Sequence, residues 1–109
     1  MIVTEDNIHK ALQYLAEDPH PLALARKDTT NAENKAKQIY ASAFLAANGS
    51  VAAKEATATI DPTYIAAKEE EAEAIKELER HRARTRAAEM LIEVWRSENA
   101  NARVAERVR

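Results

Sequence analysis

Residues that interrupt helices are almost absent from this chain. Its 109 residues include one glycine, Gly49, and three prolines, and neither residue type occurs after Pro62. Glycine and proline are the least favourable residues in a helix interior, so long helices can run here without a break. Aromatic residues, which sheets favour, make up 5% of the chain. The sequence therefore predicts an all-α fold, and its length suffices for one small domain.

The first helix is predicted over about residues 5–18. Thr4 is a good N-cap residue, and Val3 can pack against Ile8 across the cap. The segment at 18–21 contains two prolines and ends this helix. One face is apolar at helical spacing and consists of Ile8, Ala11, Leu12 and Leu15.

Two longer helices are predicted over about residues 21–48 and 61–99. An Asn-Gly pair ends the former, and an Asp-Pro pair begins the latter. Residues 50–60, which lie between them, are expected to form at most two turns of helix. Each long helix carries a seam with alternating spacings of three and four. The first seam is Leu22, Ala25, Thr29, Ala32, Ala36, Ile39, Ala43 and Ala46. The second is Ala67, Glu71, Ala74, Leu78, His81, Thr85, Ala88, Ile92 and Trp95.

The connection between these helices is short, so they should lie antiparallel as a long, coiled-coil-like helical hairpin. Matching their facing ends puts Thr29 opposite His81, as a polar layer that helps to fix the register. The longer helix overhangs its partner, and the short N-terminal helix is expected to pack at this open end. Residues 1–100 are therefore expected to form a single helical domain, with 101–109 as a frayed helix end or a tail.

Apolar residues exceed what this hairpin needs. The overhanging end carries an apolar block that the first helix is expected to cover: Met90, Leu91, Ile92, Val94 and Trp95. Other apolar residues lie partly off the seams, and the economical explanation is a two-fold homodimer. The candidate packing or interface residues are Tyr40, Phe44, Leu91, Ile92 and Trp95.

Four arginines occur at every second position from residue 80. Arg80 and Arg84 share one helix face, and Arg82 and Arg86 share another. Two such pairs could contact successive phosphates of a nucleic acid. The alternative is a solvated helix flank that pairs with the acidic block at 61–79 between antiparallel chains. The flank is favoured, because the net charge is −2 and no aromatic residues interleave with the arginines.

Nothing in the sequence suggests catalysis. The chain has no cysteine, which excludes thiolate metal sites and fits a reducing cytoplasm. Its histidines lack partners at helical spacing, and the glutamates at 68–79 lack Glu-x-x-His spacing. We therefore expect no enzyme, no catalytic residues, no cofactor and no metal. With neither a leader-like segment nor an apolar run of membrane length, we expect a cytoplasmic protein without a membrane partner.

The run AAEMLIEVWRSENANAR at 87–103 resembles the C-terminal signature of a family of short, uncharacterised helical proteins encoded by phages and prophages. In that family a similar IEVWR segment ends a long helix after a polar, arginine- or lysine-rich stretch. A second similarity lies in ASAFLAANGSVAAK at 41–54. The resemblance implies an accessory role in replication or recombination modules, and it assigns no functional residues. The tail NARVAERVR departs from the family pattern because it is longer and more apolar.

These features predict a small phage-type accessory or adaptor protein that acts through self-association and protein–protein contacts. Its partner would be a second copy or a phage or host protein. The alternative is a DNA-binding accessory that uses the arginines at 80–86. Steep salt dependence of DNA binding would distinguish the alternative from the adaptor.

Overall fold

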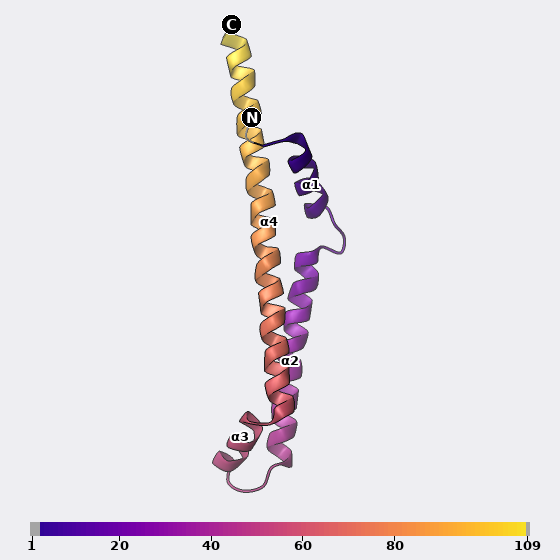
Figure 1. The fold of residues 1–109 in the computed structure, drawn as a ribbon, viewed down its shortest axis with the longest axis vertical. Coiled ribbons are helices and arrows are strands. Elements are labelled where there is room, and N and C mark those ends of the chain that lie inside the picture. Colours follow the sequence, from indigo (N-terminus) through magenta and orange to yellow (C-terminus); the bar gives the residue numbers. More distant parts are fainter. Residues whose placement is uncertain (1–2, 109) are drawn as a thin grey trace. The chain divides into compact units, whose positions relative to one another are not determined.

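The structure, a computed structural model, describes residues 3–108. This part of the chain contains helices and no strands, which confirms the all-α class (Figure 1). The helices are α1 (Glu5–Leu15), α2 (Pro21–Ala46), α3 (Val51–Thr59) and α4 (Pro62–Val108). α4 does not end near Asn99, as the sequence predicted, but continues through the region expected to be a frayed end or a tail.

The chain divides into two compact units. Residues Ala23–Glu79 form the hairpin unit, which contains most of α2, all of α3 and the first part of α4. The terminal unit combines the chain up to Leu22 with the chain from Arg80 onward, so it contains α1 and the later part of α4.

Side chains that precede the helices satisfy the first free backbone amides. The hydroxyl of Thr4 accepts a hydrogen bond from the amide of Asn7 at 3.2 Å. The carboxylate of Asp61 does the same for the amide of Tyr64 at 3.0 Å. Ser50 caps α3 by the same type of bond. The predicted start signals at Thr4 and Asp61 are therefore confirmed.

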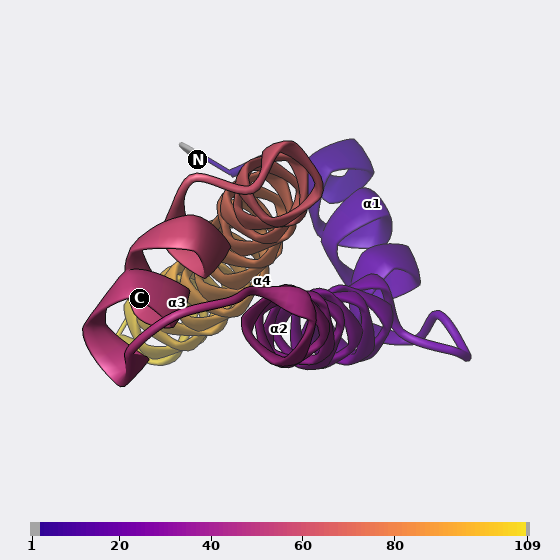
Figure 2. The same ribbon diagram turned by 90° about the horizontal axis from the view of Figure 1, so that it is seen from below.

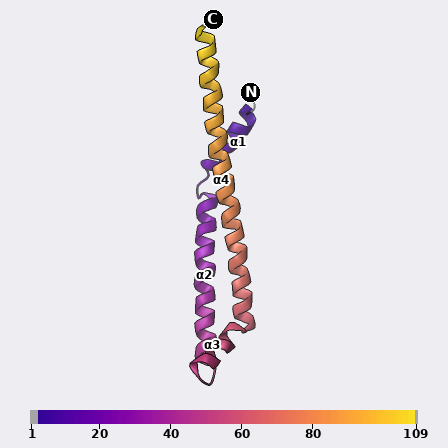
Figure 3. The same ribbon diagram turned by 90° about the vertical axis from the view of Figure 1, so that its left-hand side faces the viewer.

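The hairpin unit is built on the two predicted seams. α2 and the first part of α4 run antiparallel, side by side, as Figures 1 and 3 show. The most buried seam residues in this unit are Ala25, Thr29, Ala36, Ala67 and Leu78, each at most 7% exposed. Small side chains at these positions let the two helices approach closely. The long antiparallel helical hairpin is thus confirmed, although the last residue of the first seam, Ala46, is exposed.

The predicted register of the hairpin is wrong. The hydroxyl of Thr29 donates to the carbonyl of Ala74 at 3.2 Å and to that of Ala25 in its own helix at 2.9 Å. Thr29 therefore faces Ala74, and the predicted layer with His81 does not form. At the other end of the hairpin, the rings of Tyr40 and Tyr64 meet edge to face at 5.2 Å.

The helix α3 explains this shift. The prediction allowed residues 50–60 at most two turns of helix and placed the facing ends of α2 and α4 level with each other. The segment folds as the nine-residue helix α3, which lies beside the end of α2 and the first turns of α4 (Figure 2). Ala58 of α3 is completely buried, and the ammonium of Lys54 lies 5.6 Å from the ring centre of Phe44. α4 therefore begins close to the level of Tyr40, before α2 has ended.

In the terminal unit, α1 packs against the later part of α4, as expected for the short N-terminal helix (Figure 1). Their core consists of Ala11, Tyr14 and Ala88, with Leu15 and Ile92 packed against it. Leu12, predicted on the apolar face of α1, is instead 50% exposed. The buried face of α1 runs through residues 8, 11 and 14, which turns Leu12 toward solvent.

Candidate protein-interaction surface

The later part of α4 has one face that α1 covers. This face carries the second half of the predicted seam, from His81 to Trp95. Ala88 is buried, and the other members of that segment are half-buried. Ile92 and Trp95, two of the predicted packing or interface residues, are half-buried, and Ile92 packs against the core that contains Ala88. Leu91, next to this face, is also half-buried and lines a shallow groove between α1 and α4.

A second seam lies on the opposite side of α4 and faces solvent. We call it the exposed α4 seam; its members follow one another at spacings of four and three, and all are exposed: Ala83, Ala87, Met90, Val94, Ser97, Asn101 and Val104. Met90 is 62% exposed, Val94 41% and Val104 58%. We expected α1 to cover Met90 and Val94, and this prediction is wrong. At about 100° per residue, both point away from the face that holds Ala88 and Ile92.

The last turns of α4 extend beyond α1 (Figure 1). Every residue from Ala100 to Arg107 is exposed. Isolated helices shorter than about 12–15 residues are marginal in water, because tertiary packing supplies most of the stability of a protein helix. A helix end that carries Val104 in the open is therefore a segment that a partner helix would stabilise.

Tyr14 is the centre of a polar cluster between α1 and α4. Its side chain is 3% exposed, and its hydroxyl lies 3.2 Å from both the carbonyl of His81 and the hydroxyl of Thr85. The same oxygen lies 3.3 Å from Nδ1 of His81. The guanidinium of Arg84 lies 4.0 Å from the centroid of the Tyr14 ring. The ring of His20 meets the Tyr14 ring edge to face, with 4.9 Å between the two centroids. These contacts bind α1 to one turn of α4.

His81 connects Tyr14 and Arg80 through its two ring nitrogens. Nδ1 lies 3.3 Å from the hydroxyl oxygen of Tyr14, and Nε2 lies 3.3 Å from the guanidinium of Arg80, which can only donate. Thr85 donates to the carbonyl of His81 at 2.8 Å, which completes the network. His81 therefore serves the docking of α1, in place of the predicted layer with Thr29.

The four candidate nucleic-acid contacts are all exposed, as a flank or a phosphate-binding surface requires: Arg80, Arg82, Arg84 and Arg86. Within the terminal unit, the guanidinium of Arg84 stacks on the ring of Tyr14, and that of Arg80 lies 3.3 Å from Nε2 of His81. The regular spacing of the arginines gave no sign of these contacts.

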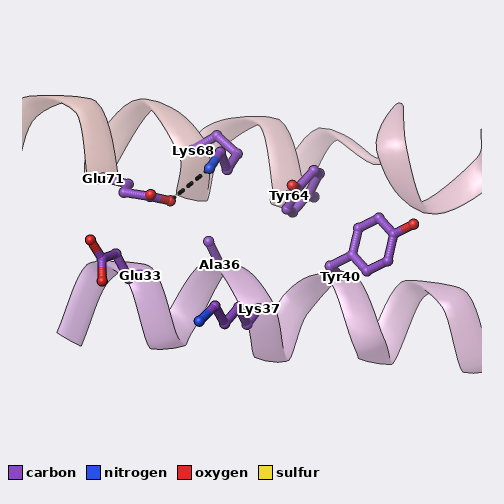
Figure 4. Close-up of a pocket in the computed structure, with 7 residues that line it drawn as sticks. All are labelled: Glu33, Ala36, Lys37, Tyr40, Tyr64, Lys68 and Glu71. Carbon is purple, nitrogen blue, oxygen red and sulfur yellow. Dashed lines mark hydrogen bonds and ion pairs between the residues drawn. The ribbon is translucent and has the colours of Figure 1, made fainter. Parts of the chain in front are cut away.

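A groove in the hairpin unit lies between α2 and α4 (Figure 4). Its volume is about 470 Å³, and its lining residues are Glu33, Ala36, Lys37, Tyr40, Tyr64, Lys68 and Glu71. The ammonium of Lys68 donates to the carboxylate of Glu71 at 2.9 Å. This hydrogen bond raises the pKa of Lys68. Lys68 and Glu71 thus form an ion pair at the rim, and the half-buried Tyr40, a predicted packing residue, contacts Tyr64 inside the unit.

Phe44 has a similar role. It is half-buried, and Lys54 of α3 lies over its ring. Both aromatic candidates on α2 therefore make contacts that belong to the hairpin unit.

Tyr14 is a buried packing residue that the sequence prediction missed. It lies three residues after Ala11 and six after Ile8, so helical spacing could have placed it on the buried face. The hydroxyl of Tyr14 has its partners, His81 and Thr85, in a distant part of the chain, and local spacing does not indicate them.

The described residues contain no group of three or more histidine, cysteine, aspartate or glutamate side chains arranged to hold a metal ion. None of the helices in residues 3–108 combines the length and apolar character needed to cross a membrane. Comparisons with protein-family models, curated proteins and solved structures gave no match to this chain.

Proposed function

We propose that this protein is a non-catalytic, cytoplasmic accessory protein that acts through self-association and protein–protein contacts. The observation that carries the proposal is the exposed α4 seam, where Met90, Val94 and Val104 recur at helix-pairing spacing on a face that α1 leaves uncovered. Alternating spacings of three and four are the pattern by which helices pair along their length. A second copy of the chain presents the same pattern and is the partner we propose.

Sedimentation equilibrium tests this proposal. We expect the wild-type chain to reach a dimer mass at high micromolar concentration. The double variant Met90→Glu/Val94→Glu should stay monomeric, because pairing would bury two carboxylates without partners. Leu12→Glu is the matched control, since Leu12 is exposed to a similar extent but lies on α1, outside the seam. Circular dichroism should show unchanged helix content in all three proteins. A wild-type chain that remains monomeric at the highest concentration would overturn the proposal.

The resemblance of residues 87–103 to short phage and prophage proteins supports an accessory role of this kind. On that basis the protein would work within a phage replication or recombination module. A phage or host protein could then bind the paired chains.

A second candidate function is DNA binding, which the exposure of all four arginines at 80–86 favours. Fluorescence anisotropy with double-stranded DNA tests it at about 50 and 200 mM salt. DNA binding by this protein should weaken steeply as the salt concentration rises. The double variant Arg82→Gln/Arg86→Gln should have a lower affinity for DNA than the wild-type chain. The self-association proposal predicts no binding at either salt concentration.

A further inference from the structure

We infer that two copies of the chain pair antiparallel through the exposed α4 seam, with Ala87 of each copy opposite Met90 of the other. The inference rests on the self-association proposed above, and it adds the orientation and register of the pair. It concerns one face of the later part of α4, between about Ala83 and Val94, where the seam is most apolar.

Side-chain size supports this register. In an antiparallel pair, each seam residue of one helix shares a layer with a seam residue of the other, and the two positions have a constant sum. With Ala87 opposite Met90, the next layer places Ala83 opposite Val94. The two-fold axis repeats both layers. Each layer thus joins one alanine to one larger side chain, and small residues opposite large ones fill the space between close helices.

Charge selects the antiparallel orientation. Arg86 and Glu93 each precede a seam residue by one position, and both are exposed. Antiparallel helices bring such flanking positions together, so Arg86 of one copy would face Glu93 of the other twice in the dimer. In a parallel pair, Glu93 would instead lie beside Glu98 of the partner copy. Like charges at these positions oppose association.

Charge also selects the register. A shift by one heptad would keep apolar residues in the seam but would place Glu93 opposite its own copy. In the inferred register, Glu93 keeps its present partner Arg96, 3.4 Å away, and gains Arg86 of the partner copy.

The packing of α1 leaves this face accessible. α1 contacts α4 through Ala88 and Ile92, which lie on the side of α4 opposite Met90 and Val94. Ala87 lies at the edge of the groove between α1 and α4 and is itself exposed. The two copies can therefore meet without undocking α1. Tyr14 and its polar contacts would remain as they are in the single chain.

Disulfide trapping tests orientation and register together, and the absence of native cysteine keeps the experiment clean. The variants are Ala83→Cys and Val94→Cys, each prepared alone and then mixed under mild oxidation. The inference predicts a cross-linked heterodimer from the mixture, because residues 83 and 94 share a layer. Neither variant alone should cross-link, because position 94 of one copy would lie about 16 Å along the helix from position 94 of the other, and the same separation holds for position 83. A disulfide requires Cα atoms within about 7 Å.

Each other outcome overturns the inference in a distinct way. Disulfide-linked homodimers of each variant, with no cross-linked heterodimer in the mixture, would show a parallel pair. A dimer by sedimentation without either product would show another register or surface. In both cases the inferred antiparallel register is wrong while self-association stands. A chain that is monomeric at all concentrations would contradict both the register and the self-association.

Charge reversal provides a second test that needs no cysteine. Arg86→Glu and Glu93→Arg should each weaken dimerisation by roughly twofold to fivefold for each lost pair, as expected of exposed ion pairs. The double variant Arg86→Glu/Glu93→Arg should recover the wild-type dissociation constant, because each reversed charge again meets its opposite. Losses that simply add in the double variant would contradict the proposed pairing.

Discussion

Tyr14 shows how one side chain can hold a helix in place. Its ring fills the contact between α1 and α4, and its hydroxyl reaches His81 and Thr85. Arg84 covers the ring from outside. A buried tyrosine whose hydroxyl is satisfied in this way supplies both apolar area and a fixed orientation.

Removing only the hydroxyl separates these two contributions. Tyr14→Phe should lower the free energy of unfolding by about 1–2 kcal/mol, because the ring stays while the polar atoms around it lose a partner. Urea unfolding followed by circular dichroism measures this change. Leu12→Ala, in the same helix but half exposed, serves as the comparison and should change stability by less. A Tyr14→Phe variant as stable as the wild-type chain would show that the polar network contributes nothing.

The pair formed by Lys68 and Glu71 gives a prediction for titration. The hydrogen bond to Glu71 raises the pKa of Lys68 above its ordinary value of 10.5. The bond therefore favours the folded state below that pH, and its contribution is lost as the pH rises through the raised pKa. NMR titration of the Lys68 side chain should show the raised value, and Glu71→Gln should return it toward 10.5. An unchanged titration in the variant would refute the assigned cause.

At the scale of elements, the sequence predicted what depends on spacing and missed what depends on distant contacts. The seams and the caps at Thr4 and Asp61 follow from local periodicity and side-chain type, and they agree with the structure. The register of the hairpin depends on how residues 51–59 fold, which no local pattern determines. The exposed α4 seam was visible in the sequence, but a strongly apolar block at 90–95 suggested that one neighbour covers all of it.

Gly49 lies at the boundary between α2 and α3, where its backbone conformation makes substitution unfavourable. Its φ of +109° is a conformation that residues with a Cβ rarely adopt, and an added Cβ would lie 3.2 Å from the Cβ of Ala53. Gly49→Ala should therefore destabilise the protein by about 1 kcal/mol or more, whereas alanine normally stabilises a helical chain relative to glycine. Thermal unfolding compares it with Asn48→Ala, the neighbouring exposed position. A more stable Gly49→Ala variant would contradict the strain.

For the whole molecule, self-association makes stability depend on concentration. Binding that occurs only between folded chains raises the unfolding midpoint by mass action. The midpoint of the wild-type chain should therefore rise with protein concentration, while that of Met90→Glu/Val94→Glu should stay constant. Circular dichroism melts at low and high micromolar concentration provide the comparison. A constant wild-type midpoint would argue against pairing of the folded chains.

The predominance of alanine among the buried residues limits how this chain can evolve. Among residues 3–107, alanine accounts for six of the ten buried hydrophobic residues: Ala11, Ala25, Ala36, Ala58, Ala67 and Ala88. Among the amino acids that a single nucleotide change can substitute for alanine, only glycine is smaller, and every other replacement adds atoms to a space that a methyl group already fills. Genetic drift at these positions is therefore limited by volume more than by polarity. Related chains should keep small residues there while their exposed positions diverge freely.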